Sequence, residues 1–131
     1  MEVKLEEGKH LLSAGGDINL ENEYGDEMSG VAFIIDDNVW VAYEDPADGY
    51  RSYGKFEPYT GDAKQLEGLI TFPEQEVNLE FKEEDYFEGI ALTNIKNGKE
   101  ILNVGTDYSD SYYPYCHFEW IPENLPINQG W

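Results

Sequence analysis

Residues 31–43 read Val-Ala-Phe-Ile-Ile-Asp-Asp-Asn-Val-Trp-Val-Ala-Tyr, and this stretch decides the fold class. Its two ends, Val31–Ile35 and Val39–Tyr43, consist of β-branched, aromatic and small apolar residues, a composition that favours extended chain. The polar segment between them, Asp36–Asn38, has the composition of a tight turn. The stretch therefore predicts a β-hairpin.

Further strands are predicted on both sides of this hairpin. Lys9–Ser13 is expected to form a first strand that ends in a turn at Gly15–Asp17, and Ile18–Leu20 a second, short strand. Pro73 is expected to end the strand before it, because proline cannot donate to a strand ladder. The strands predicted after the hairpin are Tyr50–Tyr59, Leu69–Phe72, Val77–Phe81, Tyr86–Ile95, Glu100–Val104 and Tyr115–Trp120.

The turn signals complete the predicted architecture. Asn97-Gly98 lies between two apolar runs and is expected to close a hairpin in which both residues have positive φ. Asp62–Leu66 is expected to form one helical turn. This pattern predicts an all-β or β-dominated chain with one short helical turn, arranged as a single antiparallel sandwich or barrel of about eight strands. A length of 131 residues fits one acidic β-rich domain spanning residues 1–131.

The composition is that of a folded, soluble chain. Aromatic residues make up 15% of the sequence and hydrophobic residues 40%, which suffices to build a core. No apolar run reaches the length of about 18 residues that suggests a membrane-spanning helix. The segment Met1–Glu7 lacks the cationic and apolar regions of a signal peptide, and the single Cys116 cannot form an internal disulfide. We therefore expect a protein of a reducing cytoplasm without a membrane partner.

The charge limits the possible partners. Asp and Glu number 28 against eight Lys and Arg, so the net charge is −20. Residues 1–65 and residues 66–131 each carry −10, so the charge belongs to the whole domain and not to a tail. Nucleic acid and anionic membranes are disfavoured partners, whereas basic proteins and divalent cations are favoured. A second interpretation stays open, because a net charge far from zero also keeps a protein soluble.

The mean surface density of this charge is lower than that of DNA. A folded chain of this size exposes about 7,000 Å², or about 250 Å² for each carboxylate. Duplex DNA has about 100 Å² for each phosphate. Imitation of DNA therefore requires that the acidic residues gather on one face. The candidates for such an acidic surface are Glu21, Glu23, Asp26, Glu27, Glu80, Glu83, Glu84, Asp85 and Glu88.

The sequence offers little for catalysis. Cys116 and His117 are adjacent, so along a strand their side chains point to opposite faces and do not form a catalytic pair. One cysteine and two histidines are a poor set of zinc ligands, and no glycine-rich phosphate loop is present. In so acidic a chain, carboxylate pairs at glycosidase spacing arise by chance. The sequence predicts a binding protein without a cofactor, not an enzyme.

Two loops combine carboxylates with tyrosines. Residues 44–52 include the only arginine of the chain, Arg51, whose guanidinium can pair with a carboxylate of its own loop or with a partner. Residues 104–115 include four tyrosines, and Tyr and Arg are enriched at interface hot spots. Turn chemistry alone also accounts for most of these residues, so a purely structural role stays open. The candidate partner-binding residues are Glu44, Asp45, Asp48, Tyr50, Arg51, Asp107, Asp110, Tyr112 and Tyr113.

The same loops offer an alternative site. Asp107, Ser109 and Ser111 alternate as calcium ligands do, but the central glycine and the closing glutamate of an EF-hand are missing. A looser oxygen-ligand site made by the carboxylates of both loops stays open, so the sequence leaves the metal question undecided. The alternative function is a small-ligand or calcium-binding module that uses the 44–52 and 106–115 loops.

Two segments resemble a family of small uncharacterised acidic proteins from tailed bacteriophages. The first is Glu-Asp-Pro-Ala-Asp-Gly-Tyr-Arg-Ser at residues 44–52. The second runs from Gly98 to Thr106 and continues to Asp110–Pro114, and it includes Val-Gly-Thr-Asp followed by Asp-Ser-Tyr-Tyr-Pro. The resemblance implies a phage-encoded protein that acts in the cytoplasm of a bacterial host. It implies no particular reaction or ligand.

Charge and resemblance together favour an acidic phage protein that inhibits or modulates a host protein. It is expected to occupy a basic nucleic-acid-binding surface, as DNA-mimic proteins of the anti-restriction or anti-CRISPR type do. The expected partner is therefore a basic host protein and not nucleic acid itself. The ligand-binding module above and a structural or interaction protein of the phage stay open as alternatives.

Overall fold

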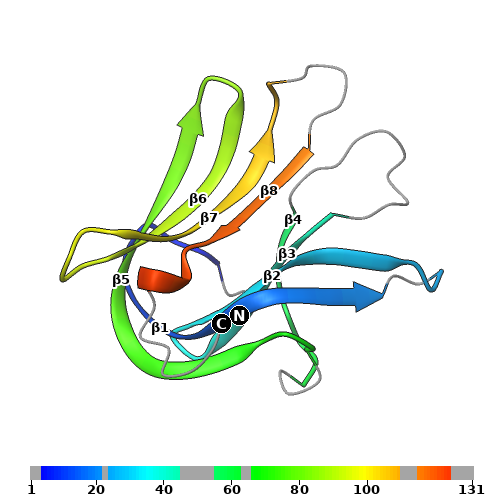
Figure 1. The fold of residues 1–131 in the computed structure, drawn as a ribbon, viewed down its shortest axis with the longest axis horizontal. Helices are drawn as coiled ribbons and strands as arrows, with labels where there is room; N and C mark the ends of the chain where they lie inside the picture. The colour runs from blue at the N-terminus through cyan, green and yellow to red at the C-terminus, as the bar shows by residue number, and fades with distance from the viewer. Residues whose placement is uncertain (1–3, 22–23, 45–54, 63–65, 110–114, 125–131) are drawn as a thin grey trace.

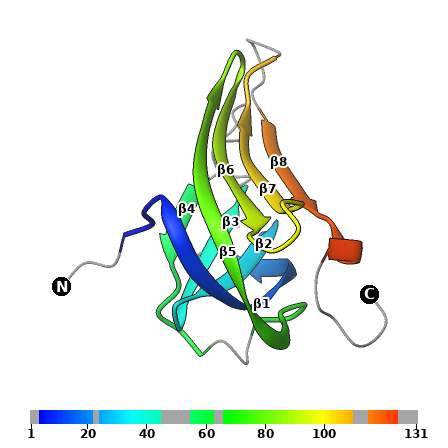
Figure 2. The same cartoon turned by 90° about the vertical axis from the view of Figure 1, so that its left-hand side faces the viewer.

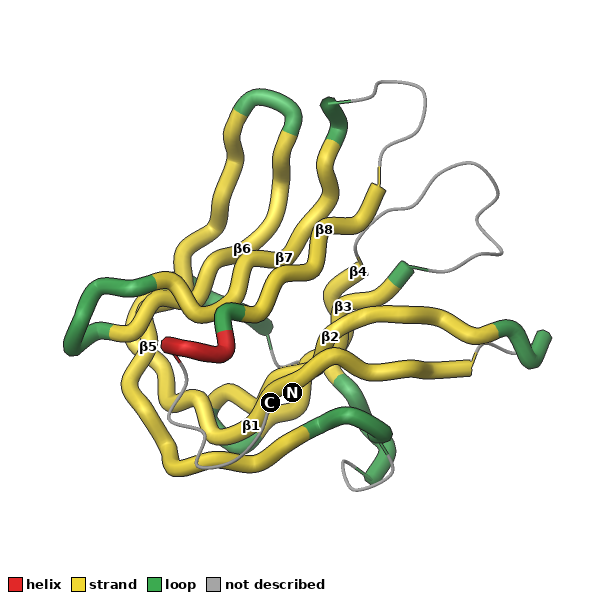
Figure 3. The backbone as a smooth tube through the Cα atoms, viewed as in Figure 1, coloured by secondary structure: helices red, strands yellow, loops and turns green. Residues whose placement is uncertain are grey.

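A computed structural model describes residues 4–21, 24–44, 55–62, 66–109 and 115–124. The described strands are all antiparallel and belong to one open sheet with the order β4-β3-β2-β1-β5-β6-β7-β8, which confirms the predicted all-β class with eight strands (Figure 3). A 3-10 turn follows the last strand, and no helix among the described residues has the length and apolarity needed to cross a membrane. The strands are β1 (Gly8–Glu21), β2 (Glu27–Ile35), β3 (Asn38–Tyr43), β4 (Lys55–Pro58), β5 (Ile70–Glu84), β6 (Phe87–Asn94), β7 (Glu100–Asp107) and β8 (Tyr115–Trp120), and the 3-10 turn is η3 (Pro122–Asn124).

The hairpin predicted from residues 31–43 is confirmed as β2 and β3. Ile35 pairs with Asn38, so the turn consists of Asp36 and Asp37 alone. Both have positive φ, 50° and 67°, as the two central residues of a type I′ turn require. Aspartate tolerates this conformation better than most residues, because its short side chain can bond to nearby backbone groups.

The sheet folds over so that its two halves face each other, with β1 and β5 bending between them (Figure 1). Each strand alternates its side chains between two faces, and the inner face of both halves forms the main core. This core joins residues of β1, β2 and β3 to residues of β5, β6, β7 and β8. Its largest fully buried members are Leu12, Val31, Phe33, Val77, Leu79, Ile90, Leu92, Ile101, Leu102 and Val104.

A second, smaller core lies on the outer face of the first half. It is built from Ile18 of β1, Ala32 of β2 and Val41 of β3. Leu66, from the connection between β4 and β5, is buried against them. Because β4 lies beside β3 and β5 lies beside β1, this connection has to cross the outer face of the sheet. It thereby covers apolar positions that an uncovered sheet would expose to water.

The predicted turn at Gly15–Asp17 is wrong, because β1 runs through it without interruption. The two glycines serve close approach instead. A side chain on Gly15 would overlap the indole ring of Trp120 in β8, and one on Gly16 would overlap the carbonyl oxygen of Gly68. Glycine is thus required where β1 is approached on both faces, first by the opposite half of the sheet and then by the crossing connection.

The predicted strand end at Pro73 is also wrong, because β5 continues from Ile70 to Glu84. Pairing with β1 jumps from Gln75, opposite Leu12, to Thr71, opposite Ala14. Three residues of β5, including Pro73, therefore face one residue of β1 in a bulge. A bulge is the place in a strand where the missing N–H of proline does least harm, and it bends the strand as this fold requires.

The remaining strand predictions hold with adjusted limits. β6 and β7 form the predicted hairpin, but the loop is wider than a two-residue turn: Asn94 N–H donates to Lys99 O over 2.9 Å, and only Gly98 of the Asn97-Gly98 pair has positive φ. Tyr115–Trp120 forms β8 with the predicted bounds. Of the predicted Tyr50–Tyr59 strand, residues 50–54 lie outside the described residues and Lys55–Pro58 forms β4; the predicted helical turn at 62–66 also lies largely outside the described residues.

The contact between Gly15 and Trp120 makes a stability prediction. Gly15→Ala should destabilise the fold by about 1–3 kcal/mol, because the new methyl group overfills a closed contact. Chemical denaturation measures the free energy of unfolding. In the Trp120→Leu background, which leaves room for the methyl group, the same substitution should have a much smaller effect. Equal losses in both backgrounds would contradict the contact.

Candidate functional site

The β5–β6 hairpin ends in a concentrated group of carboxylates. Glu84 pairs with Phe87, so the turn consists of Asp85 and Tyr86. We call Glu83, Glu84, Asp85 and Glu88 the acidic tip; all four are exposed, and Glu80 is exposed farther down the outer face of β5. These predicted acidic residues lie together towards one end of a long hairpin, Glu83 and Glu88 on its inner face and Glu80 and Glu84 on its outer face, and this end rises to the top of Figures 1 and 2.

Two of these carboxylates oppose each other directly. Glu83 of β5 pairs with Glu88 of β6. The N–H of Phe81 points away from β6, because it donates to Glu7 Oε2 over 3.1 Å. By alternation Glu83 also turns its backbone groups away from β6, so its pair with Glu88 is of the non-hydrogen-bonded kind, in which side chains lie closest. Like charges directly opposite each other destabilise a sheet, by up to about 1 kcal/mol.

Exposed aromatic residues accompany these carboxylates. Tyr86 in the turn is 67% exposed, and Phe81 on the inner face of β5 is 48% exposed, although its partner Ile90 on β6 is buried in the main core. Tyr86 has φ 70°, a left-handed conformation that costs about 1–3 kcal/mol for a residue other than glycine. The tip therefore holds charge, an aromatic ring and backbone strain that stability alone does not explain.

The second predicted acidic group lies on a different hairpin. Glu21 of β1 pairs with Glu27 of β2, and Asp26 beside them is exposed, as is Tyr24 at 73%. Glu23 lies outside the described residues. This end of the β1–β2 hairpin lies well below the acidic tip in Figure 1, so the two groups form separate patches. The whole surface of 8120 Å², shared among 28 carboxylates, gives about 290 Å² for each, which is far more dilute than DNA.

Of the predicted partner-binding residues, the structure describes only Glu44 and Asp107. Both are half-buried, and Asp107 Oδ1 accepts a hydrogen bond of 2.7 Å from Ser109 N–H. The end of β3, which precedes the first loop, lies beside the start of β8, which follows the second, because the Cys116 thiol lies 3.9 Å from the carbonyl oxygen of Tyr43. The other members, namely Asp45, Asp48, Tyr50, Arg51, Asp110, Tyr112 and Tyr113, lie outside the described residues. Within the described ranges no group of three or more His, Cys, Asp or Glu residues is placed to hold a metal ion.

Asp107 also lines a groove on the outer face of the second half of the sheet. The groove has a volume of about 210 Å³ and is lined by Lys82, Glu84, Phe87, Asn103, Asp107 and His117. His117 Nε2 lies 3.4 Å from Glu119 Oε2, and its ring meets that of Phe87 edge-on at 5.8 Å. Since Cys116 faces inward and His117 outward, the expected separation of these two neighbours is confirmed.

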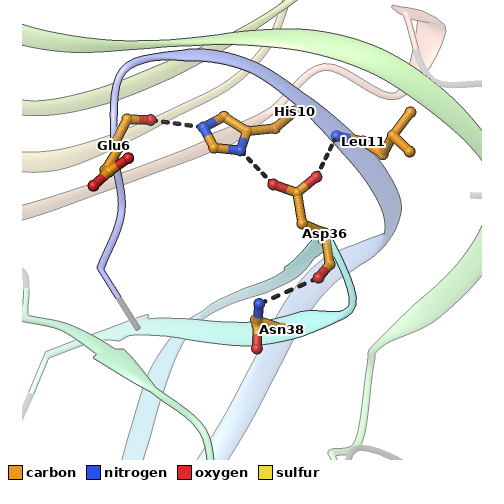
Figure 4. A network of polar contacts seen from close by, with 5 residues as sticks. All are labelled: Glu6, His10, Leu11, Asp36 and Asn38. Carbon is orange, nitrogen blue, oxygen red and sulfur yellow. Dashed lines mark hydrogen bonds and ion pairs between the residues drawn. The ribbon is translucent and has the colours of Figure 1, made fainter. Parts of the chain in front are cut away.

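A hydrogen-bonded network ties the start of the chain to the β2–β3 turn (Figure 4). His10 Nδ1 lies 2.6 Å from Asp36 Oδ2, and His10 Nε2 lies 2.7 Å from the carbonyl oxygen of Glu6. The other carboxylate oxygen of Asp36 accepts from Leu11 N–H over 2.9 Å. Both neighbours of the imidazole are acceptors, so the doubly protonated ring satisfies both.

The network shifts both pKa values. Burial alone would lower the pKa of His10, but the hydrogen bonds to Asp36 and to Glu6 O outweigh it and raise the pKa above 6.5. Burial would raise the pKa of Asp36, but the hydrogen bonds from His10 and Leu11 lower it below 3.8. The pair is therefore fully charged over a wider pH range than the isolated groups would be.

This charge state makes a pH prediction. The contribution of His10 to stability is complete below about pH 6.5 and is lost as the pH rises through its raised pKa; that of Asp36 is lost as the pH falls through its lowered pKa. His10→Gln should therefore lower the melting temperature most between about pH 4 and 6.5. The corresponding loss in the free energy of unfolding should be less than about 1 kcal/mol, since both groups are partly exposed. In an Asp36→Asn background the pH dependence of this difference should disappear. A difference that is constant from pH 5 to 8 would contradict the assignment.

Comparison with models of known protein families, with curated proteins and with solved structures gave no match. The resemblance to tailed-phage proteins at residues 44–52 and 98–114 stays a prediction. The case for function therefore depends on the geometry and the charge of the described residues.

The sequence reasoning missed the exposed aromatics and the His10 network. Val77, Leu79 and Phe81 alternate, so the pattern placed Phe81 on the inner face but could not show that its side chain is half exposed. The sequence predicts Tyr86 as the first residue of a strand and not as part of a turn, because tyrosine is not one of the residues that usually occupy the second position of a two-residue turn. His10 and Asp36 are 26 residues apart, and no local signal joins them.

Proposed function

We propose that this protein binds a basic, nucleic-acid-binding surface of another protein through the acidic tip of its β5–β6 hairpin. The observation that carries the proposal is the direct pairing of Glu83 with Glu88 at an exposed hairpin end, beside Glu84 and Asp85. Such a group weakens the free protein and is relieved when cationic side chains arrive between its members. We therefore infer that the repulsion between Glu83 and Glu88 serves to favour the binding of a cationic partner.

The aromatic residues support the same interpretation. Tyrosine is enriched in the centres of protein interfaces, and its ring attracts the guanidinium of arginine or the ammonium of lysine. Tyr86 presents such a ring in the middle of four carboxylates, and Phe81 adds apolar area on the inner face. A surface that binds nucleic acid carries the complementary lysines and arginines.

The proposed contact is local, in keeping with the low mean charge density. A hairpin end can enter a groove shaped for a nucleic acid strand without the whole surface imitating DNA. The remaining negative charge steers a basic partner towards the protein and speeds association, most strongly at low salt. If the resemblance to tailed-phage proteins holds, the partner is a host protein that acts on nucleic acid, and the effect of binding is inhibition.

Capture from a bacterial lysate tests the proposal. The immobilised protein should retain basic nucleic-acid-binding proteins at low salt, release most of them at moderate salt, and release them when duplex DNA is added as a competitor. The double variant Glu83→Gln/Glu88→Gln should retain at least several-fold less. Its free energy of unfolding should be unchanged or raised by up to about 1 kcal/mol, since the repulsion is removed.

The matched control is Glu57→Gln/Glu67→Gln, which removes the same charge from two exposed positions elsewhere. It should retain nearly as much as the unmodified protein. Equal losses in both double variants would show that only net charge matters and would refute the assignment to the tip. Capture that is insensitive to both salt and DNA would refute the proposed function itself.

Tyr86 separates stability from binding. Tyr86→Gly should raise the free energy of unfolding by up to about 1–3 kcal/mol, because glycine adopts positive φ without strain. The same variant should weaken retention of the captured protein, because the exposed ring is lost. Denaturation and quantitative capture, measured on the same preparation, check the two effects. A variant that is more stable and binds as before would exclude Tyr86 from the contact.

A further inference from the structure

The upper part of β5 has a free edge. β5 pairs with β6 as far as Glu84, but its pairing with β1 ends where Gly8 meets Leu79. Among the described residues, no strand lies on the β1 side of residues 80–84. Figure 2 shows this part of β5 as the open border of the upper half of the molecule.

Gly8 is the reason that the edge stays open. It has φ 122°, a conformation that residues with side chains rarely adopt. The chain before it therefore turns away from β5 and does not extend β1 alongside Phe81 and Glu83 (Figure 2). Leu5, just upstream, is packed against the main core, which fixes this departure.

The backbone groups of the free edge follow from the alternation of the strand. Phe81 N–H points to the open side, where the carboxylate of Glu7 accepts its hydrogen bond at 3.1 Å. Glu83, two residues on, points its N–H and C=O the same way. Glu7 thus occupies, with a side chain, the place that a carbonyl oxygen of a neighbouring strand would take.

We propose that an extended basic segment of the partner adds to this edge as a ninth, antiparallel strand along Phe81–Glu83. This inference rests on the proposed function and specifies the mode of contact. Strand addition supplies affinity through main-chain hydrogen bonds and specificity through alternate side chains. Charge decides between occupants: a second copy of a chain with net charge −20 is repelled, whereas a basic segment is attracted.

The side chains of β5 specify an alternating pattern in the added strand. On the outer face it would meet Glu80, Lys82 and Glu84; Lys82 Nζ already lies 3.6 Å from Glu80 Oε2, so Glu84 is the carboxylate that most favours lysine or arginine. On the inner face it would meet Phe81, which favours an apolar residue, and Glu83, which adds to the negative charge beside the edge. The residue opposite Phe81 forms a hydrogen-bonded pair with it, so the apolar residues of the added strand are those whose N–H groups point to β5.

The probe that follows is the capped peptide Lys-Val-Lys-Val-Lys-Val-Lys, with binding followed by titration calorimetry at low salt. Methylation of the valine N–H groups should abolish binding, because these groups face β5. Methylation of the lysine N–H groups should leave it nearly unchanged, because these face outwards. Both modified peptides keep the same charge, so attraction of charges alone predicts equal affinities, and that result would overturn the proposal.

Glu7 supplies the matched protein test. Glu7→Ala frees Phe81 N–H and should tighten peptide binding by about fivefold, which corresponds to the net free energy of roughly one hydrogen bond. Glu6→Ala removes the same charge one residue away while the cap on Phe81 remains, and should weaken binding slightly. If both variants weaken binding alike, the edge is not the site. That outcome would not affect the proposed function. The proposed function would fail separately, if capture from the lysate did not depend on salt or on added DNA.

Discussion

The indole ring of Trp120 rests on the backbone of Gly15, and the rest of the fold depends on that approach. β8 and β1 are not neighbours in the sheet; β5, β6 and β7 lie between them. The contact therefore acts across the core and not along the hydrogen-bonded ladder. A single open sheet cannot bury its own apolar face while it stays flat. By folding at β1 and β5 until Trp120 meets Gly15, this sheet becomes both layers of its own core.

The local part of this fold could be predicted from the sequence, and the long-range part could not. The β2–β3 hairpin and β8 were found because their pattern and their turn residues lie within a few positions of each other. Gly15-Gly16 and Pro73 were misjudged because they usually interrupt strands. Here Gly15 and Gly16 admit a ring and a backbone carbonyl from distant segments, and Pro73 lies in the bulge that lets β5 bend. Neither reason is visible until the partners of β1 are known.

The same limit applies to the candidate site. The run of acidic residues at 83–85 was found from composition, and its exposure follows from charge alone. The strain at Tyr86, the pairing of Glu83 with Glu88 and the open edge of β5 all depend on register, which composition does not contain. The loops at 44–52 and 106–115 were the more attractive candidates from the sequence. Of their proposed residues, the described part of the chain includes only Glu44 and Asp107, so the case for them is unchanged.

Like charges and unpaired backbone can be concentrated only where the core does not depend on them. On β5 itself the buried inner positions end at Leu79, and Phe81 is half exposed at the border of the sheet, although Ile90 and Val104 in the same row are buried in the main core. A free strand edge is ordinarily a hazard, because any chain with the same edge can add to it. The carboxylates around this edge exclude that partner by repulsion. In the proposed mode of contact, the charges that keep copies of this chain apart are thus the ones that would select a basic strand.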